Sequence, residues 1–357
     1  MQASAADSVL PVRKQRFMLD DKIDLRPKIS VVTVFYNRAN LVERSIGSLL
    51  DQTASSYEII FVDDGSTDDT LSAIEAFADP RLRIIAKANS GFTSSLKLGI
   101  AAAKGKFIAI HGAGDISLPQ RLEKQQAILE GNDAVGIVGC GYEFNGRRVG
   151  PSLDHAFETG KVLERLRIGN PFSHGEVMFR RSTYDQVGGY DEKFPYAQDF
   201  DLWLRMGRAC NYAILADTLY IKIDPPNSVS QNVRKYYAQQ KLAQLALESA
   251  ERAAASDDAL VEWLGDLEKR PTLGTKKHAR RFFGKGIEAF YRGDVDGARF
   301  IWAMTWRERR DFRGATAFAL ANLCRFKAGE AVLRWVFLLK WRLFGRRYAP
   351  VAEQGNR

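Results

Sequence analysis

The first part of the chain alternates two patterns of apolar and polar residues. Apolar runs of strand length, rich in β-branched residues, cover residues 29–37, 57–66, 81–91 and 106–115. Between them, apolar residues recur at the spacing of amphipathic helices over residues 41–50, 70–78 and 94–103. Strands separated by helices of this length predict an α/β fold: a doubly wound, mostly parallel sheet with helices on both faces.

Each predicted strand ends in polar or small residues. These ends are Asn37–Arg38, Asp63–Ser66, Asn89–Gly91 and Gly112–Asp115. Parallel strands place their carboxyl ends at one edge of the sheet, where ligands bind in such folds. Four polar ends in succession therefore predict one ligand site at this edge rather than four unrelated turns.

The pattern changes to helices alone after about residue 230. Residues 233–255 and 256–270 have helical spacing, and residues 278–326 read as paired helices joined at Gly293–Asp294. Residues 1–28 are polar and lack the apolar core of a signal peptide. We therefore predict a lead-in (1–28), an α/β domain (29–230) and an all-helical, basic C-terminal extension (231–357).

The composition is that of an ordinary globular protein, with 45% hydrophobic and 27% charged residues. Three widely spaced cysteines fit neither a disulfide framework nor a zinc cluster, which favours a reducing cytoplasm. The formal charge is +9, but residues 271–357 hold 19 Lys and Arg against 7 Asp and Glu. The excess charge thus lies in the tail. Without a recognisable nucleic-acid-binding module, we expect no nucleic-acid partner.

The tail contains an aromatic and basic segment, VLRWVFLLKWRLFGRR, at residues 332–347. It lacks the roughly 18 uninterrupted apolar residues of a membrane span. Two alternatives remain open for it. It docks on an anionic membrane surface, where basic and aromatic side chains are favourable, or it packs on the rest of the extension.

Several motifs follow one another between about Ile29 and Ser230. They read VTVFYNRANLVERSIGSLLDQT, YEIIFVDDGSTDDT, NSGFTSSLKLGI, DISLPQRLEKQ, SHGEVMFRRSTYDQVGGYDE and YAQDFDLWLRM. In this order they resemble family 2 glycosyltransferases with a GT-A fold, of the type found in bacterial polysaccharide and glycan biosynthesis.

The resemblance implies an inverting glycosyltransferase of the cytoplasm or the inner membrane face, acting in cell-surface polysaccharide synthesis. Its donor would be a nucleotide sugar, UDP-linked, and its acceptor a hydroxyl of a glycan or a lipid-linked glycan. The alternative is a catalytically inactive sugar-nucleotide-binding or scaffold protein.

The resemblance also implies a nucleotide-sugar site at the strand ends. Its predicted members are Thr33, Phe35, Asn37, Arg38, Asp63, Asp64, Gly65, Asn89, Gly91, Lys97 and Asp115. In the family, the residue matching Asp64 contacts the nucleotide, and those matching Thr33, Phe35 and Asn37 line the base and ribose pocket. For Asp63 a second role stays open, that of a turn cap with Ser66.

The segment QDFDLWLR supplies the candidate catalytic base. In the family, the Asp matching Asp199 takes the proton from the acceptor hydroxyl. Gln198 replaces the usual Glu, and we expect Asp201 to be a helix N-terminal cap. The predicted acceptor and phosphate region consists of His174, Gly175, Gln198, Trp203 and Lys222. His174 has a second interpretation, as a packed and hydrogen-bonded histidine.

One motif departs from the family. Its Asp-x-Asp pair, which holds a divalent cation against the donor phosphates, falls here on Gly112 and Gly114. This leaves Asp115 as the single carboxylate for Mg²⁺ or Mn²⁺, which often binds through one or two carboxylates, phosphates and water. The alternative is that Lys97, Lys222 or His111 stabilises the leaving diphosphate without a metal.

Overall fold

The structure, a computed structural model, describes residues 26–151, 155–157, 159–223, 231–252 and 276–308, with residues 316, 319–320, 322–323 and 331. Its strands are β1 Ile29–Phe35, β2 Tyr57–Asp63, β3 Leu82–Ala86, β4 Phe107–His111, β5 Ile116–Ser117, β6 Val135–Phe144, β7 Arg147–Val149, β8 His155–Phe157, β9 Met178–Arg180 and β10 Asn211–Lys222. Its helices are α1 Ala39–Leu50, α2 Thr70–Glu75, α3 Phe92–Ala102, α4 Arg121–Gly131, α5 Thr159–Ile168, the 3₁₀ turn η1 His174–Glu176, α6 Arg181–Gln186, α7 Gln198–Met206, α8 Val233–Arg252, α10 Lys276–Tyr291 and α11 Val295–Glu308. The predicted lead-in up to residue 25, the predicted helix 256–270 and the tail from Val332 lie outside the described residues.

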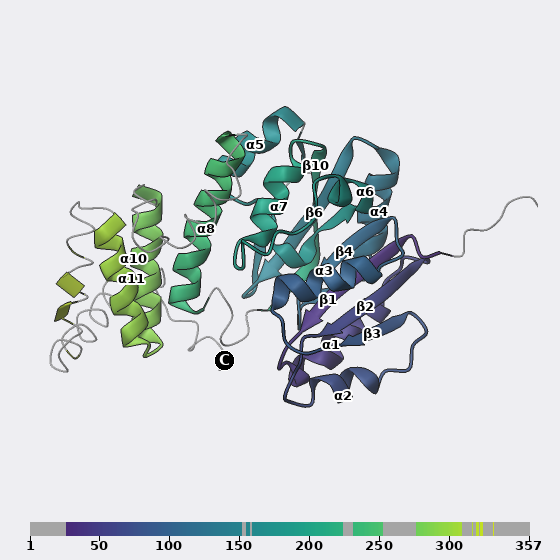
Figure 1. Cartoon of the computed structure of the whole chain (residues 1–357), viewed down its shortest axis with the longest axis horizontal. Coiled ribbons are helices and arrows are strands. Elements are labelled where there is room, and N and C mark those ends of the chain that lie inside the picture. Colours follow the sequence, from purple (N-terminus) through teal and green to yellow (C-terminus); the bar gives the residue numbers. More distant parts are fainter. Residues whose placement is uncertain are drawn as a thin grey trace, which may run out of the picture.

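The strands form one sheet in the order β3-β2-β1-β4-β9-β6-β10-β5, seen near the centre of Figure 1. Strands β3, β2, β1 and β4 are parallel, as predicted. Strand β9 runs antiparallel to both of its neighbours, β4 and β6, whereas β6 and β10 pair in parallel. The sheet is therefore parallel in its first half and mixed in its second half.

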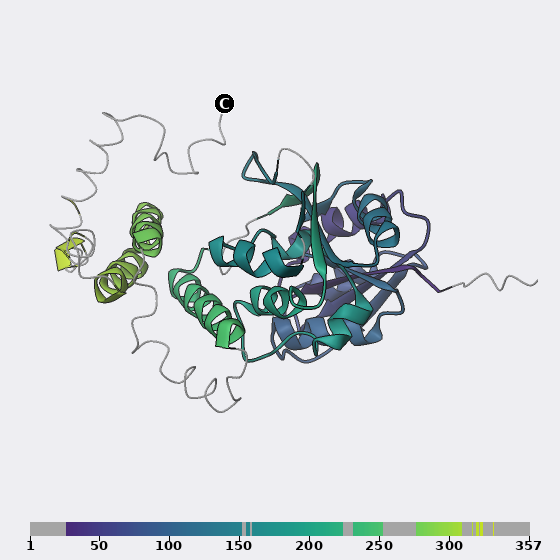
Figure 2. The ribbon, with the colours of Figure 1, turned by 90° about the horizontal axis from the view of Figure 1, so that it is seen from above.

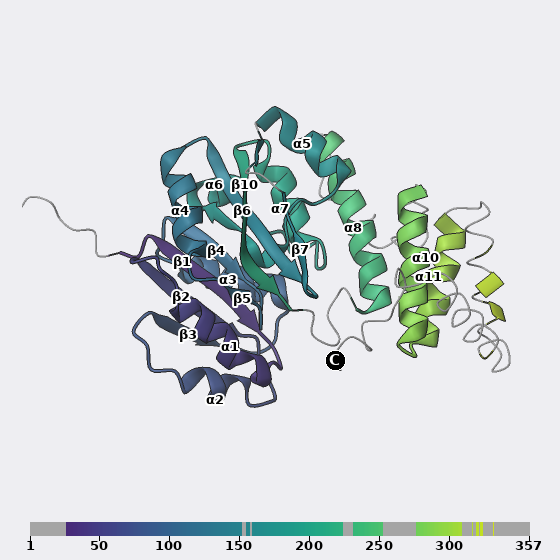
Figure 3. The same cartoon turned by 180° about the vertical axis from the view of Figure 1, so that it is seen from behind.

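Helices cover both faces of the sheet, which confirms the predicted α/β architecture. On one face, α1, α2 and α4 bury their apolar side chains against β1, β2 and β4. On the other face, α3, α5, α7 and α8 pack around a second apolar cluster. Figure 3 shows the same layers from behind. The alternating side chains of each central strand feed the two clusters in turn, as the period of a strand requires.

The carboxyl ends of β1, β2, β3 and β4 lie at the same edge of the sheet, as predicted. Backbone hydrogen bonds also join the residues that follow β2 and β3 to the last residues of the neighbouring strands. The amide of Asp64 donates to Phe35 O (2.9 Å), and the amide of Lys87 donates to Asp63 O (3.1 Å). The parallel pairing thus brings together turns that are far apart in the sequence.

Helices α8, α10 and α11 form a separate layer beside the sheet domain (Figure 2). Helices α10 and α11 are joined at Gly293, which has a φ of 85°, in agreement with the predicted helix pair. Helix α8 contributes Leu242 and Leu245 to the sheet domain's core, and Val233 and Tyr237 to the core of the extension. Among the described helices, none is long and apolar enough to cross a membrane.

Candidate active site

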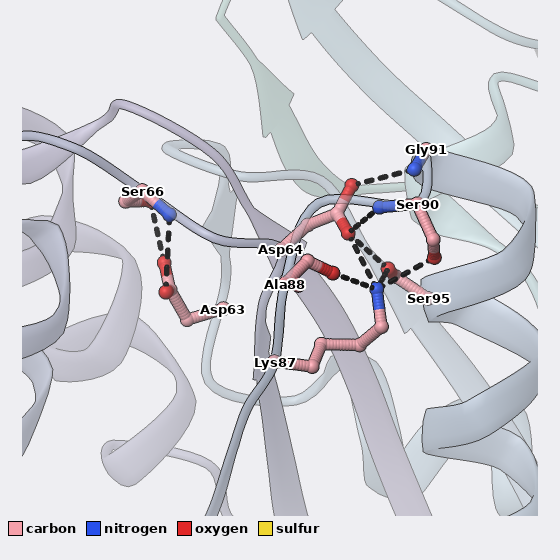
Figure 4. A network of polar contacts seen from close by, with 8 residues as sticks. All are labelled: Asp63, Asp64, Ser66, Lys87, Ala88, Ser90, Gly91 and Ser95. Atoms are coloured by element: carbon pink, nitrogen blue, oxygen red, sulfur yellow. Dashed lines mark hydrogen bonds and ion pairs between the residues drawn. The ribbon is translucent and has the colours of Figure 1, made fainter.

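Asp64 at the end of β2 is the centre of a hydrogen-bond network (Figure 4). Its Oδ1 accepts hydrogen bonds from Lys87 Nζ (2.8 Å), the Ser90 amide (2.9 Å) and Ser95 Oγ (2.7 Å). Its Oδ2 accepts one from the Gly91 amide (3.0 Å). Burial acts to raise the pKa of Asp64, but these hydrogen bonds outweigh burial and lower the pKa below its usual value. Asp64 is thus a buried anion that joins β2 to the loop before α3.

Asp63 and its neighbours shape the adjacent turn. Asp63 accepts hydrogen bonds from the Ser66 amide and hydroxyl, so the turn-cap role left open for Asp63 is present. Ser66 Oγ in turn accepts the amide hydrogen of Asn37 (3.0 Å). Gly65 has a φ of 73°, and a Cβ at this position would lie 2.5 Å from the backbone nitrogen of Asn89, an exposed residue of the loop after β3. Only glycine fits this close approach of two loops.

The end of β1 differs from the prediction. Thr33 and Phe35 have no exposed surface and lie inside the domain, so neither side chain faces an open pocket at the strand end. Tyr36 is 47% exposed at the same strand end. Every residue of β1 is buried, because helices cover both faces of the sheet, whereas Tyr36 lies just past the last residue of the strand and is exposed. Arg38 directly precedes α1, and its backbone amide donates a hydrogen bond to Oγ1 of Thr70, the first residue of α2 (2.8 Å).

Asp115 is buried between the turn after β4 and the end of β10. Its Oδ2 accepts the hydroxyl hydrogen of Tyr220 (2.6 Å), and its Oδ1 accepts the amide hydrogen of Ile223 (2.8 Å). Tyr220 Oη also accepts the amide hydrogen of Gly112 (2.9 Å). A Cβ on Gly175 would lie 2.2 Å from Tyr220 Oη. Burial raises the pKa of Asp115 despite these hydrogen bonds.

This arrangement does not fit a divalent cation. Asp115 is 7% exposed, and both of its oxygens already accept hydrogen bonds from the protein. A Cβ on Gly112 would lie 2.2 Å from Asp115 Oδ2, and one on Gly114 would lie 2.5 Å from Leu41 Cδ1. Within the described part of the chain, no group of three or more His, Cys, Asp or Glu is placed to hold a metal ion.

The three cations considered as substitutes for a metal differ in their surroundings. His111 is buried and bonded to Ser45 Oγ (2.8 Å), and burial lowers its pKa to about 3, so it is neutral and cannot stabilise a diphosphate. Lys97 on α3 is paired with Glu192 (2.7 Å). Lys222 lies at the end of β10, two residues from Tyr220, which bonds to Asp115.

Asp199 lies in the first turn of α7. Its Oδ2 accepts a hydrogen bond from Asn170 Nδ2 (3.1 Å), which fixes the carboxylate against the end of α5. The prediction that Asp201 caps the helix is wrong, because the N-cap position is Ala197. Asp201 instead pairs with Arg205 one turn later (2.6 Å), on the buried side of the helix.

The predicted acceptor residues lie around the same helix. His174 Nε2 hydrogen-bonds to Tyr190 Oη (2.7 Å), and its ring packs edge-on against Tyr190 and Trp203, so it is a packed histidine. Trp203 has no exposed surface and lies behind the site. Gln198 is 8% exposed, and its Oε1 has no hydrogen-bond partner among the described residues.

Lys222 acts electrostatically on two groups of the candidate site. The charge of Lys222 acts to lower the pKa of both Asp115 and His174. Burial is the main cause that lowers the pKa of His174, and the charge of Asp199 acts against it. The candidate site consists of Asp64 just after β2, Asp115 after β4, Lys222 at the end of β10 and Asp199 in the first turn of α7.

This sheet, parallel in its first half and mixed in its second, with carboxylates after β2 and β4, is an α/β domain of the GT-A fold. Residues 30–188 match the family described as "Glycosyl transferase family 2", and this part of the chain belongs to that family.

Known proteins resemble the chain over part of their length. An uncharacterised glycosyltransferase of Haemophilus influenzae is 32% identical over 203 residues, which cover 52% of this chain and 63% of that protein. EpsE of Bacillus subtilis is 36% identical over 191 residues, 50% of this chain and 66% of EpsE. The chain thus spans less than two thirds of the curated relatives. Residues 1–349 of S. aureus TarS, in complex with UDP-GlcNAc, share the fold with a TM-score of 0.53 at 17% identity, covering 90% of this chain and 93% of that chain.

Proposed function

We propose that this protein is an inverting glycosyltransferase that moves a sugar from a UDP-sugar to a hydroxyl of a glycan or lipid-linked acceptor. The observation that carries the proposal is the match of residues 30–188 to family 2, together with Asp64 just after β2, Asp115 after β4 and Asp199 in the first turn of α7. The TarS structure of the same fold contains UDP-GlcNAc, which supports a UDP-linked donor.

Asp199 acts as the general base in this proposal. It removes the proton from the acceptor hydroxyl while the oxygen attacks the anomeric carbon and the bond from that carbon to the diphosphate breaks. Its hydrogen bond from Asn170 holds one carboxylate oxygen. Within the described part of the chain, the other oxygen accepts no hydrogen bond from a side chain, so it can receive the proton.

Lys222 stabilises the diphosphate that leaves. Its side chain lies within electrostatic range of Asp115 and His174, both at the centre of the site. Since the surroundings of Asp115 do not fit a divalent cation, the proposed reaction uses this ammonium as its positive charge.

The base is tested with Asp199→Asn, which keeps the shape of the side chain and removes its basicity. We expect release of UDP from UDP-GlcNAc or another UDP-sugar in the presence of acceptor to fall by a factor of roughly 100 or more. The matched control is Asp185→Asn, an exposed carboxylate 3.7 Å from Arg181. Turnover that survives in Asp199→Asn, or a product with retained anomeric configuration, would refute the mechanism.

Metal dependence is tested by calorimetry of UDP binding in EDTA and then with added Mn²⁺ or Mg²⁺. We expect the same affinity in both conditions, because a single buried and hydrogen-bonded carboxylate offers little to a cation. Binding that tightens sharply with metal would contradict this expectation.

A second candidate function is a catalytically inactive sugar-nucleotide-binding or scaffold protein. The observation in its favour is the lack of space for side chains at Gly112 and Gly114. This function predicts that the protein binds UDP normally, but neither transfers the donor sugar to any acceptor nor hydrolyses the donor.

The proposed role in cell-surface polysaccharide synthesis places the protein in the cytoplasm, peripherally at the inner face of the membrane. The basic tail would make this contact. Deleting residues 332–357 should then move the protein from the membrane to the soluble fraction, and unchanged fractionation would exclude this role of the tail.

A further inference from the structure

A cavity of about 510 Å³ lies between the sheet domain and the helical extension. Its walls come from the end of α5, the start of α7, one face of α8 and the first turns of α10, the helices seen from above in Figure 2. Three of these four helices, α7, α8 and α10, lie beyond residues 30–188, which match the family, and α8 and α10 belong to the helical extension. The extension therefore completes a cavity that the family domain alone would leave open.

Asp199, the proposed base, forms part of the wall of this cavity. Asn170, which donates a hydrogen bond to Asp199 Oδ2, lines the cavity beside it. The charge of Asp199 also acts to raise the pKa of His174. Because Asp199 lines the cavity, a molecule bound there can place a hydroxyl group beside the proposed base.

The chemistry of the lining indicates a polar ligand. Three glutamine side chains of α8, Gln239, Gln240 and Gln244, line one wall and can donate and accept hydrogen bonds. Such amides suit the hydroxyl groups of a sugar. The remaining lining residues include apolar side chains of α5 and α8, which suit the apolar faces of a sugar ring.

The charge of the lining is positive. Arg167 from α5 and Arg281 from α10 both line the cavity, together with His278. Asp199 is the single acidic residue among the described residues of the lining. Two permanent positive charges against one negative charge favour an anion, and a guanidinium group can bind phosphate or carboxylate through two hydrogen bonds.

We propose that this cavity is the acceptor site, and that it selects an acceptor carrying an anionic group, phosphate or carboxylate, near its reacting hydroxyl. Arg167 and Arg281 bind the anion, the α8 glutamines bind the sugar, and Asp199 receives the hydroxyl proton. This inference rests on the proposed glycosyl transfer and extends it to the acceptor. The helical extension is then a specificity element of the enzyme.

The test uses the full chain saturated with UDP, so that the donor site is occupied. Glucose, glucuronic acid and glucose 1-phosphate are titrated in turn, and binding is measured by saturation-transfer NMR. We expect at least one of the two anionic sugars to bind roughly tenfold more tightly than glucose, since a charge-assisted hydrogen bond contributes about one power of ten or more. Preference for glucose 1-phosphate would indicate a phosphate-linked acceptor, and preference for glucuronic acid would indicate an acceptor with an acidic sugar. Equal binding of all three would overturn the proposal.

The position of the anion is tested with Arg281→Gln, which should remove this preference. The matched control is Arg280→Gln, the neighbouring residue of α10, which is exposed and does not line the cavity. It should keep the preference within a factor of about two. If the two variants behave alike, the cavity is not the site of selection.

UDP affinity is measured for every variant to separate this inference from the proposed function. Normal UDP binding with no anion preference would refute the acceptor inference alone. A chain that does not bind UDP would refute the proposed function itself.

Discussion

Lys241 and Glu308 form a buried ion pair that joins α8 to α11. Their charged atoms are 2.9 Å apart, and their side chains are only 1% and 2% exposed. Tyr237 also donates a hydrogen bond to Glu308 Oε1 (2.6 Å). The variant Glu308→Gln keeps an acceptor oxygen but removes the negative charge that lies 2.9 Å from the buried ammonium of Lys241. Breaking a buried pair in this way costs about 3–5 kcal/mol.

The expected loss is near the lower limit of that range, about 3 kcal/mol, because Gln retains one hydrogen bond. The assay is hydrogen exchange of α11 peptides, followed by mass spectrometry. A loss of about 3 kcal/mol should accelerate exchange of the protected amides by a factor of roughly 100. The helices that wall the cavity would loosen, so binding of anionic sugars should weaken while UDP affinity stays unchanged.

The matched control is Glu288→Gln on α10, which removes a similar charge at the surface. Glu288 is 50% exposed and pairs with Lys285 and Arg292. Exposed pairs of this kind contribute about 0–1 kcal/mol. The double variant Lys241→Met/Glu308→Gln should recover most of the lost protection, because the buried ammonium is removed together with the carboxylate. If Glu308→Gln and Glu288→Gln exchange at the same rate, the buried pair does not stabilise the extension.

Three further predictions concern the strand edge. Lys87→Met should weaken UDP binding roughly tenfold and raise the pKa of Asp64. Calorimetry of UDP binding at several pH values measures both effects. Unchanged affinity would mean that the hydrogen-bond network of Asp64 is not needed for nucleotide binding. Gly114→Ala should lower the free energy of unfolding by about 1–3 kcal/mol, because φ is +90° and the new Cβ would clash with Leu41. Urea denaturation measures the free energy of unfolding, and a variant as stable as the wild type would contradict this prediction. Burial raises the pKa of Glu176 from its ordinary value of 4.5 to about 8, so its stabilising contribution is complete below pH 4.5 and is lost as pH rises towards 8. Wild-type stability relative to Glu176→Gln should therefore fall by up to about 1.4 kcal/mol per pH unit across this window, and parallel pH profiles would contradict the assignment.

Much of the fold could be predicted because the relevant signals are local. The periods of apolar residues predicted β1 to β4 and the helices between them, and parallel strands necessarily bring their carboxyl ends to one edge. The glycine pair of this family's motifs, Gly188 and Gly189, has φ values of 80° and 67°, a conformation that glycine adopts without strain. The predicted domain boundary at residue 230 stays a prediction, since α8 shares apolar side chains with both cores.

The candidate site was predicted less completely, because a motif identifies a residue but not its surroundings. Phe35 was predicted to line the nucleotide pocket, yet it is buried, while Tyr36 is the exposed ring. His111 was considered as a cation, yet its burial keeps it neutral. The position of Asp201 within two residues of Asp199 suggested a cap, whereas the helix starts earlier and Asp201 pairs with Arg205.

The sequence by itself determined the class of fold, the family motifs and the edge at which carboxylates gather, since each depends on residues close together in the chain. Only the tertiary structure decided that Arg281 shares a cavity with Asp199, and that Lys241 meets Glu308. These pairs are separated by more than sixty residues in the sequence. Their contacts depend on how α8, α10 and α11 pack against the sheet domain, and the spacing of apolar residues along a helix does not specify its packing partner.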